Sequence, residues 1–252
     1  WGPEFEGKGR LRFYADEQRI NNEGGDINVQ IYLRPESLQR ELDASLQRLN
    51  VDCIDLYQTH WQEHTTPVEE TMGWLEEMRA AGKIRHIGCC NAELADMDRY
   101  RAAGTLDSDQ EPYSMVDRDT ESTHLAYCAD HGIALLAYSP MARGLLTGRC
   151  GPDREFDEGD QRAHNDRFSV DNRRRVQAML EDMRPVAEEL DLSFAQLSVA
   201  WALAQRGCSH ALVGARNPQQ VAENAKAGAV TLSDDQVARL NAALDAHGGE
   251  IG

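Results

Sequence analysis

Positive charge is scarce in this sequence. Its 252 residues include 26 lysines and arginines against 43 aspartates and glutamates, so the formal net charge is −17 at pH 7. Such a surface repels phosphate backbones and anionic lipid headgroups, so we expect neither nucleic acid nor a membrane as a partner. No apolar run approaches the about 20 residues that a membrane-spanning helix needs. We expect a cytoplasmic protein, although a chain that begins at Trp1 leaves a preceding targeting segment open.

Several motifs of known chemistry are missing as well. The six cysteines include no Cys-x-x-Cys pair, which suits a reducing compartment better than a disulfide framework. Cys53, Cys89 and Cys128 lie in or beside apolar runs, where a free cysteine acts as a small buried hydrophobe. The absence of Gly-x-Gly-x-x-Gly and Gly-x-Ser-x-Gly argues against a Rossmann dinucleotide site and a hydrolase nucleophile elbow.

The histidines and acidic residues show no ligand or catalytic pairing. His60, His64 and His86 lack the spacing of a zinc site, so we expect no metal. The acidic pairs Glu69-Glu70 and Glu76-Glu77 have the character of a solvated helix face. No such pair stands at a strand end, which argues against glycosidase chemistry.

Helical and apolar segments alternate along most of the chain. We predict helices over 35–49, 67–81, 94–103, 120–131, 173–190, 194–205, 218–227 and 234–246, and strands over 53–58, 84–90, 109–114, 133–138 and 211–213. This alternation predicts a parallel sheet covered by helices, in one domain over residues 1–252. We predict that residues 1–33 form a long loop. Residues 144–172 are predicted to form another, over the mouth of a barrel.

Polar residues at the ends of the predicted strands are the candidates for chemistry, because this end of a β/α barrel carries the active site. His60 follows the first strand, where it can donate a hydrogen bond to an oxyanion or relay a proton. Asn91 and Gln110 stand at the ends of the next two strands and offer amides that suit a carboxamide. The alternatives are a structural histidine and, for Asn91, a cap on the next helix.

Two turns in the second half suit a nucleotide. Tyr138 ends a strand and can stack on a flat ring, and Arg143 follows in a turn of small residues that can cradle a pyrophosphate. Gly214 begins a turn that opens a helix, and Arg216 in that turn can clamp a phosphate. For the first turn, the alternative is an ordinary connection between a strand and a loop.

Four segments together carry a family resemblance. They read SLQRLNVDCIDLYQTHW, GKIRHIGCCN, AYSPMARGLLTG and VGARNPQQVAEN. In this order and spacing the chain resembles the aldo-keto reductases from about Pro35 to Ala246. The long loop and the last turn are similar to the bacterial Tas-like and potassium-channel-β-like branch. The resemblance implies a (β/α)8 TIM-type parallel barrel and an NADP(H)-dependent enzyme that reduces an aldehyde or ketone to an alcohol, or the reverse, by hydride transfer.

The resemblance also implies a role for each matching residue. His60 would be the catalytic histidine that orients the carbonyl, and Trp61 would line the substrate pocket. Cofactor binding falls to Asn91, Gln110 and Tyr138 at the nicotinamide, to Ser139, Pro140, Met141, Arg143 and Gly144 at the pyrophosphate, and to Gly214, Ala215, Arg216, Gln220 and Asn224 at the adenosine end. Arg216 would hold the 2′-phosphate. The chain departs from the family at Cys90, where a serine is usual, and at Gln220, where many members have a basic residue.

The resemblance further implies that the early part of the barrel is absent. Five strands are predicted after the first helix, whereas a closed barrel needs eight, so we expect the first two to three β/α units, about 80–90 residues, to be missing. The family's catalytic Tyr, Asp and Lys would lie in those units, and Tyr14, Tyr32 and Lys8 are not assigned their roles. The reductase would be inactive if the chain truly starts at Trp1.

The alternative is therefore a truncated or divergent relative that binds a nucleotide or a partner chain without catalysis. Five strands leave sheet edges exposed, and a complementing chain or a homo-oligomer would cover them. Otherwise the expected partner is a small-molecule carbonyl or alcohol substrate.

Overall fold

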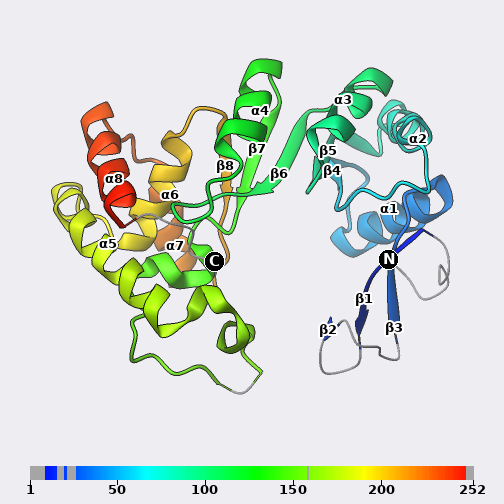
Figure 1. Ribbon diagram of the computed structural model, residues 1–252. Helices are drawn as coiled ribbons and strands as arrows, with labels where there is room; N and C mark the ends of the chain where they lie inside the picture. Colours follow the sequence, from blue (N-terminus) through cyan, green and yellow to red (C-terminus); the bar gives the residue numbers. More distant parts are fainter. Residues whose placement is uncertain (1–8, 16–19, 22–26, 158, 248–252) are drawn as a thin grey trace. The chain divides into compact units, whose positions relative to one another are not determined.

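The computed structural model describes residues 9–15, 20–21, 27–157 and 159–247. The chain divides into two compact units, Trp1–Gln110 and Glu111–Gly252, and the division falls within one strand, β6 (Ser108–Pro112) (Figure 1). The single domain over 1–252 therefore stays a prediction. In the described parts of the chain, no helix has both the length and the apolar character that crossing a membrane requires.

The first unit begins with a small antiparallel sheet of β1 (Arg10–Ala15), β2 (Ile20–Asn21) and β3 (Ile27–Ile31), in the order β2-β1-β3. The prediction of one long loop over residues 1–33 is wrong for these segments. Apolar residues alternate along β3 with the period of a strand, and Ile31 is buried. Residues 1–8, 16–19 and 22–26 of the predicted loop lie outside the described residues.

The rest of the first unit is a β/α layer. Its elements are α1 (Pro35–Leu49), β4 (Ile54–Thr59), α2 (Val68–Ala80), β5 (Ile84–Cys90), α3 (Leu94–Ala103) and the start of β6. Pro35 suits the first turn of α1, because that turn has no intrahelical acceptor for its N–H. The strands are parallel in the order β4-β5-β6, with Thr59 opposite Cys89 and Cys90 opposite Gln110. This register brings the carboxyl ends of β4 and β5 level.

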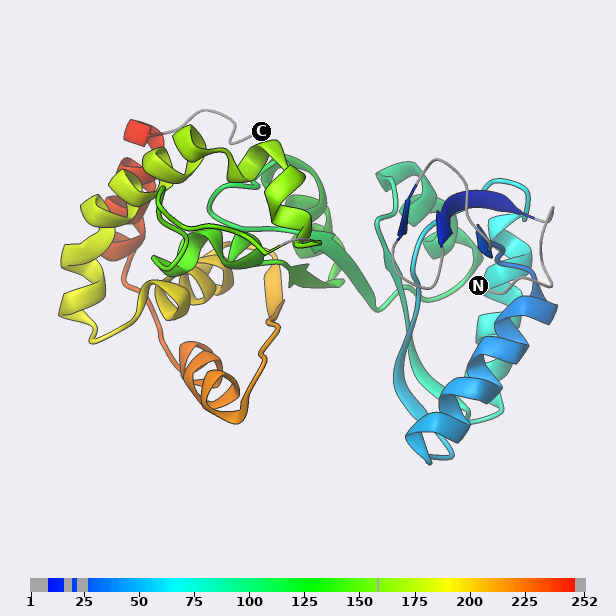
Figure 2. The same ribbon diagram turned by 90° about the horizontal axis from the view of Figure 1, so that it is seen from below.

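The second unit continues the alternation. It holds the end of β6, a π-helix η2 (Glu121–Leu125), α4 (Ala126–His131), β7 (Ala134–Tyr138), the 3₁₀ helices η3 (Ala142–Thr147), η4 (Gln161–His164) and η5 (Asp166–Phe168), α5 (Val170–Glu189), α6 (Phe194–Ala204), β8 (Cys208–Leu212), α7 (Pro218–Ala227) and α8 (Asp234–His247). Strand β7 is parallel to β8. Helices α5 and α8 lie side by side in both views (Figure 1, Figure 2).

Most predicted elements are confirmed within a few residues, and three differ more. The helix predicted over 120–131 starts as the π-helix η2. The predicted loop 144–172 contains three 3₁₀ turns, and α5 already starts at Val170 because the Ser169 side chain caps it. Strand β8 begins three residues earlier than predicted. That the loop covers a barrel mouth stays a prediction.

The cysteines follow the predicted pattern in part. Cys89 and Cys128 are buried, as expected of small apolar side chains, whereas Cys53 is half-buried. None of the six cysteines forms a disulfide.

Candidate functional site

His60 and Asn91 meet in the first unit, where β4 and β5 end. The His60 ring stacks on the Trp61 ring, with centroids 3.7 Å apart and planes inclined by 25°. Asn91 follows β5 with a left-handed backbone, φ +52°, a conformation that asparagine tolerates better than most residues. Its Nδ2 donates a hydrogen bond of 3.1 Å to the His60 carbonyl. The local fold therefore brings together three of the predicted site residues.

Gln110 joins this group through the backbone and through a thiol. The Asn91 backbone N–H donates to the Gln110 carbonyl over 3.2 Å. The Cys90 sulfur accepts from Asn91 Nδ2 at 3.0 Å and from Gln110 Nε2 at 3.4 Å. Sulfur is a weaker acceptor than the oxygen of the family's usual serine. Cys90 nevertheless occupies the serine's position between the two amides that are predicted to hold one carboxamide.

A buried carboxylate fixes the loop that follows His60. Glu63 accepts hydrogen bonds from the backbone N–H of Leu33 at 3.2 Å and of Thr65 at 2.7 Å, and from the hydroxyls of Thr65 and Thr66. Burial raises the pKa of this carboxyl, but the hydrogen bonds outweigh burial and the pKa is lowered. Sequence reasoning missed Glu63, because a single acid in an irregular loop has no periodic signal.

The neighbouring Gln62 fixes the same loop to the core. Its Nε2 donates to Thr59 Oγ1 at 3.0 Å, and its Oε1 accepts from the hydroxyl of Tyr100. Tyr100 is fully buried, which raises the pKa of its phenol. Gln62 thus holds the His60 loop to β4 and α3, and Glu63 holds it to the backbone at Leu33.

The second unit contains a cleft of about 830 Å³. It is lined by the turn after β7, by residues of the stretches 149–154 and 160–162, and by the turn that leads into α7. Nine predicted cofactor-binding residues line it: Ser139, Met141, Arg143, Gly144, Gly214, Ala215, Arg216, Gln220 and Asn224. Tyr138 and Pro140 do not. Tyr138 is the last residue of β7, and its carbonyl accepts a hydrogen bond of 3.2 Å from the Tyr113 backbone N–H.

The turn after β7 has an unusual backbone. Ser139, Ala142, Arg143 and Gly144 have φ values of +56°, +46°, +54° and +95°. Left-handed conformations are uncommon outside glycine and asparagine, and they cluster at functional sites. The N–H groups of Ala142 and Gly144 donate to the carbonyls of Ser139 and Met141, at 2.8 and 2.9 Å, and hold the turn in this shape.

The turn before α7 is held by its own side chains. The Gln220 Oε1 accepts from the Arg216 backbone N–H at 2.8 Å, and the Gln220 backbone N–H donates to Asn217 Oδ1 at 2.9 Å. Asn224 Nδ2 donates to the Gly214 carbonyl at 3.3 Å. These bonds shape the turn that carries Arg216 at the cleft.

The cleft concentrates positive charge in an acidic chain. Sequence reasoning missed several of its lining residues, among them Arg149, Cys150, Arg154, Asp160, Arg162 and Glu223. With Arg143 and Arg216 the lining holds five arginines against two carboxylates, whereas the whole chain carries −17. The segment 149–162 has no hydrophobic period, so nothing in the sequence indicated which of its side chains face a ligand. Such a lining suits an anionic ligand.

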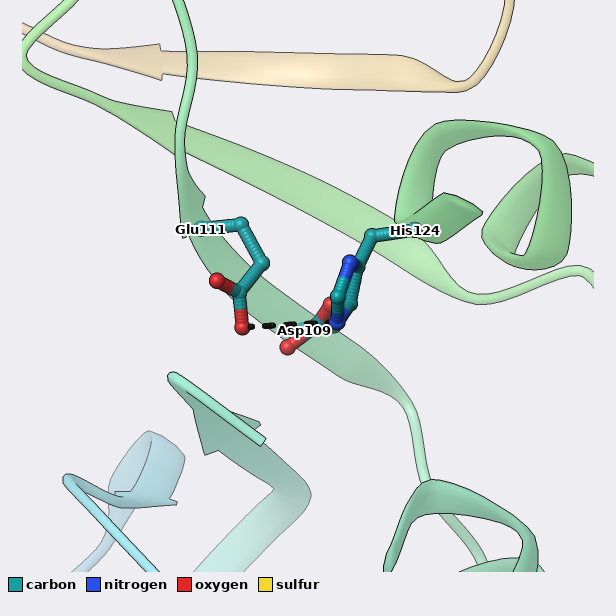
Figure 3. A group of neighbouring side chains, drawn as sticks. All are labelled: Asp109, Glu111 and His124. Carbon is teal, nitrogen blue, oxygen red and sulfur yellow. Dashed lines mark ion pairs between the residues drawn. The ribbon is translucent and has the colours of Figure 1, made fainter. Parts of the chain in front are cut away.

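A further polar pair lies on β6 and η2. Glu111 of β6 faces His124 of η2, with Oε1 and Nε2 3.9 Å apart, and Asp109 precedes Glu111 by two residues on the same strand (Figure 3). Both partners of the pair are largely buried. They form an ion pair when His124 is protonated, which links the π-helix to the strand.

The chain has a parallel β/α architecture, amides and a histidine at its strand ends, and a cleft lined by arginines. These features place it in the class of β/α proteins that bind anionic ligands beside their strands. The chain belongs to the aldo/keto reductase family, whose profile matches residues 10–245. This is a family of oxidoreductases that use nicotinamide cofactors.

Relatives with known names differ in their cofactor and substrate. The chain is 40% identical over 216 residues to an NADH-specific methylglyoxal reductase of Escherichia coli. This match covers 84% of this chain and 66% of that protein. It is 32% identical over 228 residues to an NADP(+) aldo-keto reductase of Schizosaccharomyces pombe, with 89% and 66% covered. The chain thus spans slightly less than two thirds of the length of these relatives.

Comparison with solved structures confirms the predicted fold class. A glycerol dehydrogenase of Gluconobacter oxydans superposes with a TM-score of 0.84 at 30% identity, covering 94% of this chain and 70% of that one. The fold is the (β/α)8 barrel fold of the aldo-keto reductases, of which the described residues of this chain contain the strands β4 to β8.

Proposed function

We propose that this protein is an oxidoreductase that uses a nicotinamide dinucleotide to reduce an aldehyde or ketone to an alcohol, or to run the reverse reaction. The observation that carries this proposal is the cleft of the second unit, where five arginines and a left-handed turn face one space in a strongly acidic chain. Membership of the aldo/keto reductase family supports it.

The cleft fits the phosphate and adenosine parts of a dinucleotide. Its volume of about 830 Å³ lies in the range of small-molecule sites. The turn of Ser139–Gly144 would lie against the pyrophosphate, and Arg143 would give it a charge-assisted hydrogen bond. Arg216 would hold a phosphate at the adenosine end. When bound, the dinucleotide supplies or accepts the hydride.

The strand-end group of the first unit suits the chemistry at the carbonyl. We propose that His60 donates a hydrogen bond to the carbonyl oxygen and stabilises the negative charge that develops there. Trp61 holds the imidazole by stacking and offers an apolar wall to the substrate. Asn91 and Gln110, both oriented by Cys90, would bind the carboxamide.

Arg216 favours NADP(H) as the cofactor, because a guanidinium pairs well with a 2′-phosphate. The named relatives include both an NADH-specific and an NADP(+) enzyme, so the family does not fix this choice. We also propose placement in the Tas-like and potassium-channel-β-like branch, on the length of the 144–172 segment and the sequence of the last turn.

Binding is the first test of this function. We expect NADPH, NADH or both to bind the purified protein in a fluorescence titration, and Arg143→Gln to weaken binding about tenfold or more, since a hydrogen bond between charged groups is lost. Arg206→Gln is the matched control, because Arg206 pairs with Asp130 on the surface and does not line the cleft. Binding of neither dinucleotide, or equal affinities in both variants, would contradict the proposal.

Turnover is the second test. In a protein that includes the early barrel units with the family's catalytic Tyr, Asp and Lys, we expect oxidation of the reduced cofactor, followed by its absorbance, to depend on added small aldehydes or ketones. Tight binding without any carbonyl-dependent oxidation would instead support the alternative of a nucleotide-binding relative without catalysis.

A further inference from the structure

Tyr100 is a buried tyrosine of α3 whose hydroxyl reaches the end of β4. This hydroxyl donates to Gln62 Oε1 and, at 3.4 Å, to Thr59 Oγ1. Gln62 Nε2 also donates to Thr59 Oγ1, at 3.0 Å. The three side chains form a closed triangle and are 0%, 7% and 3% exposed for Tyr100, Gln62 and Thr59. Burial keeps the pKa of Tyr100 well above its usual range, so the phenol remains a donor near neutral pH.

The triangle of Tyr100, Gln62 and Thr59 lies directly beside His60 in the chain. Thr59 is the last residue of β4, and His60 follows it as an exposed residue. Successive side chains of a strand point to opposite faces. Gln58 accordingly makes other contacts than Thr59, and its Nε2 donates to the Cys89 carbonyl at 3.0 Å. Tyr100 therefore holds the end of β4 from the face against which α3 packs.

Two further contacts restrain His60, one at its carbonyl and one at its ring. The carbonyl accepts from Asn91 Nδ2 at 3.1 Å, and the ring stacks on Trp61. Asn91 is only half-buried, and Trp61 belongs to the same loop as His60. The Tyr100 ring, by contrast, is fixed in the core. A misplacement of about 1 Å that starts far from the chemistry can cost about a hundredfold in rate, so a core contact one residue before His60 bears on turnover.

We propose that Tyr100 is a positioning residue whose hydroxyl, acting through Thr59 and Gln62, holds the end of β4 so that His60 meets the carbonyl oxygen of the substrate. This inference rests on the proposed function, because it concerns the step that His60 performs. The role needs no contact between Tyr100 and either the substrate or the cofactor. Loss of the hydroxyl should therefore spare the binding of both.

The test removes the hydroxyl and keeps the ring. In a protein that includes the early barrel units, we expect Tyr100→Phe to lower kcat about tenfold or more, while KM and the cofactor Kd change less than about twofold. Thr59→Val removes the acceptor and should lower kcat by a similar factor. The double variant should lose little more than either single variant, because both act through one contact. Tyr113→Phe is the matched control, since Tyr113 is equally buried but donates to Glu121 in the second unit.

A proton NMR signal of His60 distinguishes positioning from a general loss of stability. The stacked Trp61 ring displaces the resonance of the His60 Hε1 proton, and this resonance is identified by its absence in His60→Ala. We expect Tyr100→Phe to shift it and Tyr113→Phe to leave it in place, at a temperature well below the melting of both variants. This measurement requires no turnover.

The outcomes separate this inference from the function on which it rests. If His60→Ala loses turnover but Tyr100→Phe matches Tyr113→Phe in kcat and in the His60 resonance, the positioning role is wrong and the proposed function stands. A lower kcat with an unshifted resonance would also overturn the inference. If Tyr100→Phe does not fold, Thr59→Val decides by the same two measurements. If His60→Ala keeps its turnover, the proposed role of His60 itself fails.

Discussion

The two groups of candidate residues are built on different physical principles. In the first unit, His60, Asn91 and Gln110 are neutral or weakly basic side chains. Hydrogen bonds tie these residues to one another, and His60 stacks on Trp61. In the second unit the cleft is lined by full charges on loops, and its turn backbone adopts left-handed conformations. Reaction chemistry requires a few atoms held in place, whereas phosphate binding uses many charges whose individual positions matter less. Substitutions in the two groups should therefore have separable effects.

The largest difference between the effect on turnover and the effect on cofactor binding is expected for His60→Ala. It removes the donor to the carbonyl oxygen, so we expect kcat to fall about a thousandfold, while the cofactor Kd changes less than about twofold because His60 lies outside the arginine cleft. Arg143→Gln should show the reverse pattern, with a weakened Kd and a smaller change in kcat. The measurement is steady-state turnover beside direct cofactor titration. Equal loss of turnover and binding in His60→Ala would remove the distinction between the two groups.

The fold of the second unit should be most sensitive at Gly207. Its φ is +98°, and a Cβ there would lie 2.1 Å from the carbonyl oxygen of Leu125 in the π-helix. We expect Gly207→Ala to lower the free energy of unfolding by about 3 kcal/mol or more, from strain and collision together. Gly132→Ala is the control: its φ is +69°, but nothing lies within 4 Å, so strain alone should cost about 1–2 kcal/mol. Equal costs in urea unfolding would contradict the close approach to η2.

A pH-dependent effect is expected in the first unit at Glu63. Because the pKa of this carboxyl is lowered in the folded protein, its charge contributes stability above the unfolded pKa, and this contribution is lost as the pH falls through the folded value. We expect Glu63→Gln to cost about 2 kcal/mol near pH 7 and less in acid. Urea unfolding from pH 7 to pH 3 measures the difference. A cost that is the same at every pH would show that Glu63 acts through shape alone.

The accuracy with which the sequence predicts elements and site residues also differs between regions of the molecule. The strands 84–90 and 133–138 are recognisable because they are apolar and bounded by turn residues, and His60 and Asn91 are found because each directly follows a strand. β8 is predicted too short because Cys208, Ser209 and His210 dilute its apolar pattern. The strands of 10–31 escape notice because charged residues and glycines surround them.

The residues that line the cleft are also predicted only in part from the sequence. Arg143 and Arg216 stand in turns beside a strand and a helix, so the sequence predicts them. Asp160 and Arg162 lie in a segment without period. Their place in the cleft depends on how the loop folds back, which involves Arg173 of α5 donating to the carbonyls of Gly151 and Arg154 at 2.7 and 2.8 Å. Such contacts between distant residues leave no mark in a single sequence.

The smallest effect is expected at Cys90. Replacement by serine restores the usual residue of the family and gives Asn91 and Gln110 a stronger acceptor than sulfur. We expect Cys90→Ser to tighten cofactor binding by less than about fivefold and to leave the fold unchanged, since the two side chains are similar in size. Titration with the preferred dinucleotide measures this change. A loss of binding would mean that the sulfur is not an acceptor for these amides.

The most direct test of the central claim, that the second unit's cleft holds a dinucleotide, is amide hydrogen exchange of the protein with and without saturating NADPH or NADH. The account predicts slower exchange in three stretches that line the cleft, 139–147, 160–164 and 214–224, and little change in α8 (Asp234–His247), none of whose residues line it. Unchanged exchange in all three stretches while a dinucleotide is bound would place the ligand elsewhere and contradict the account.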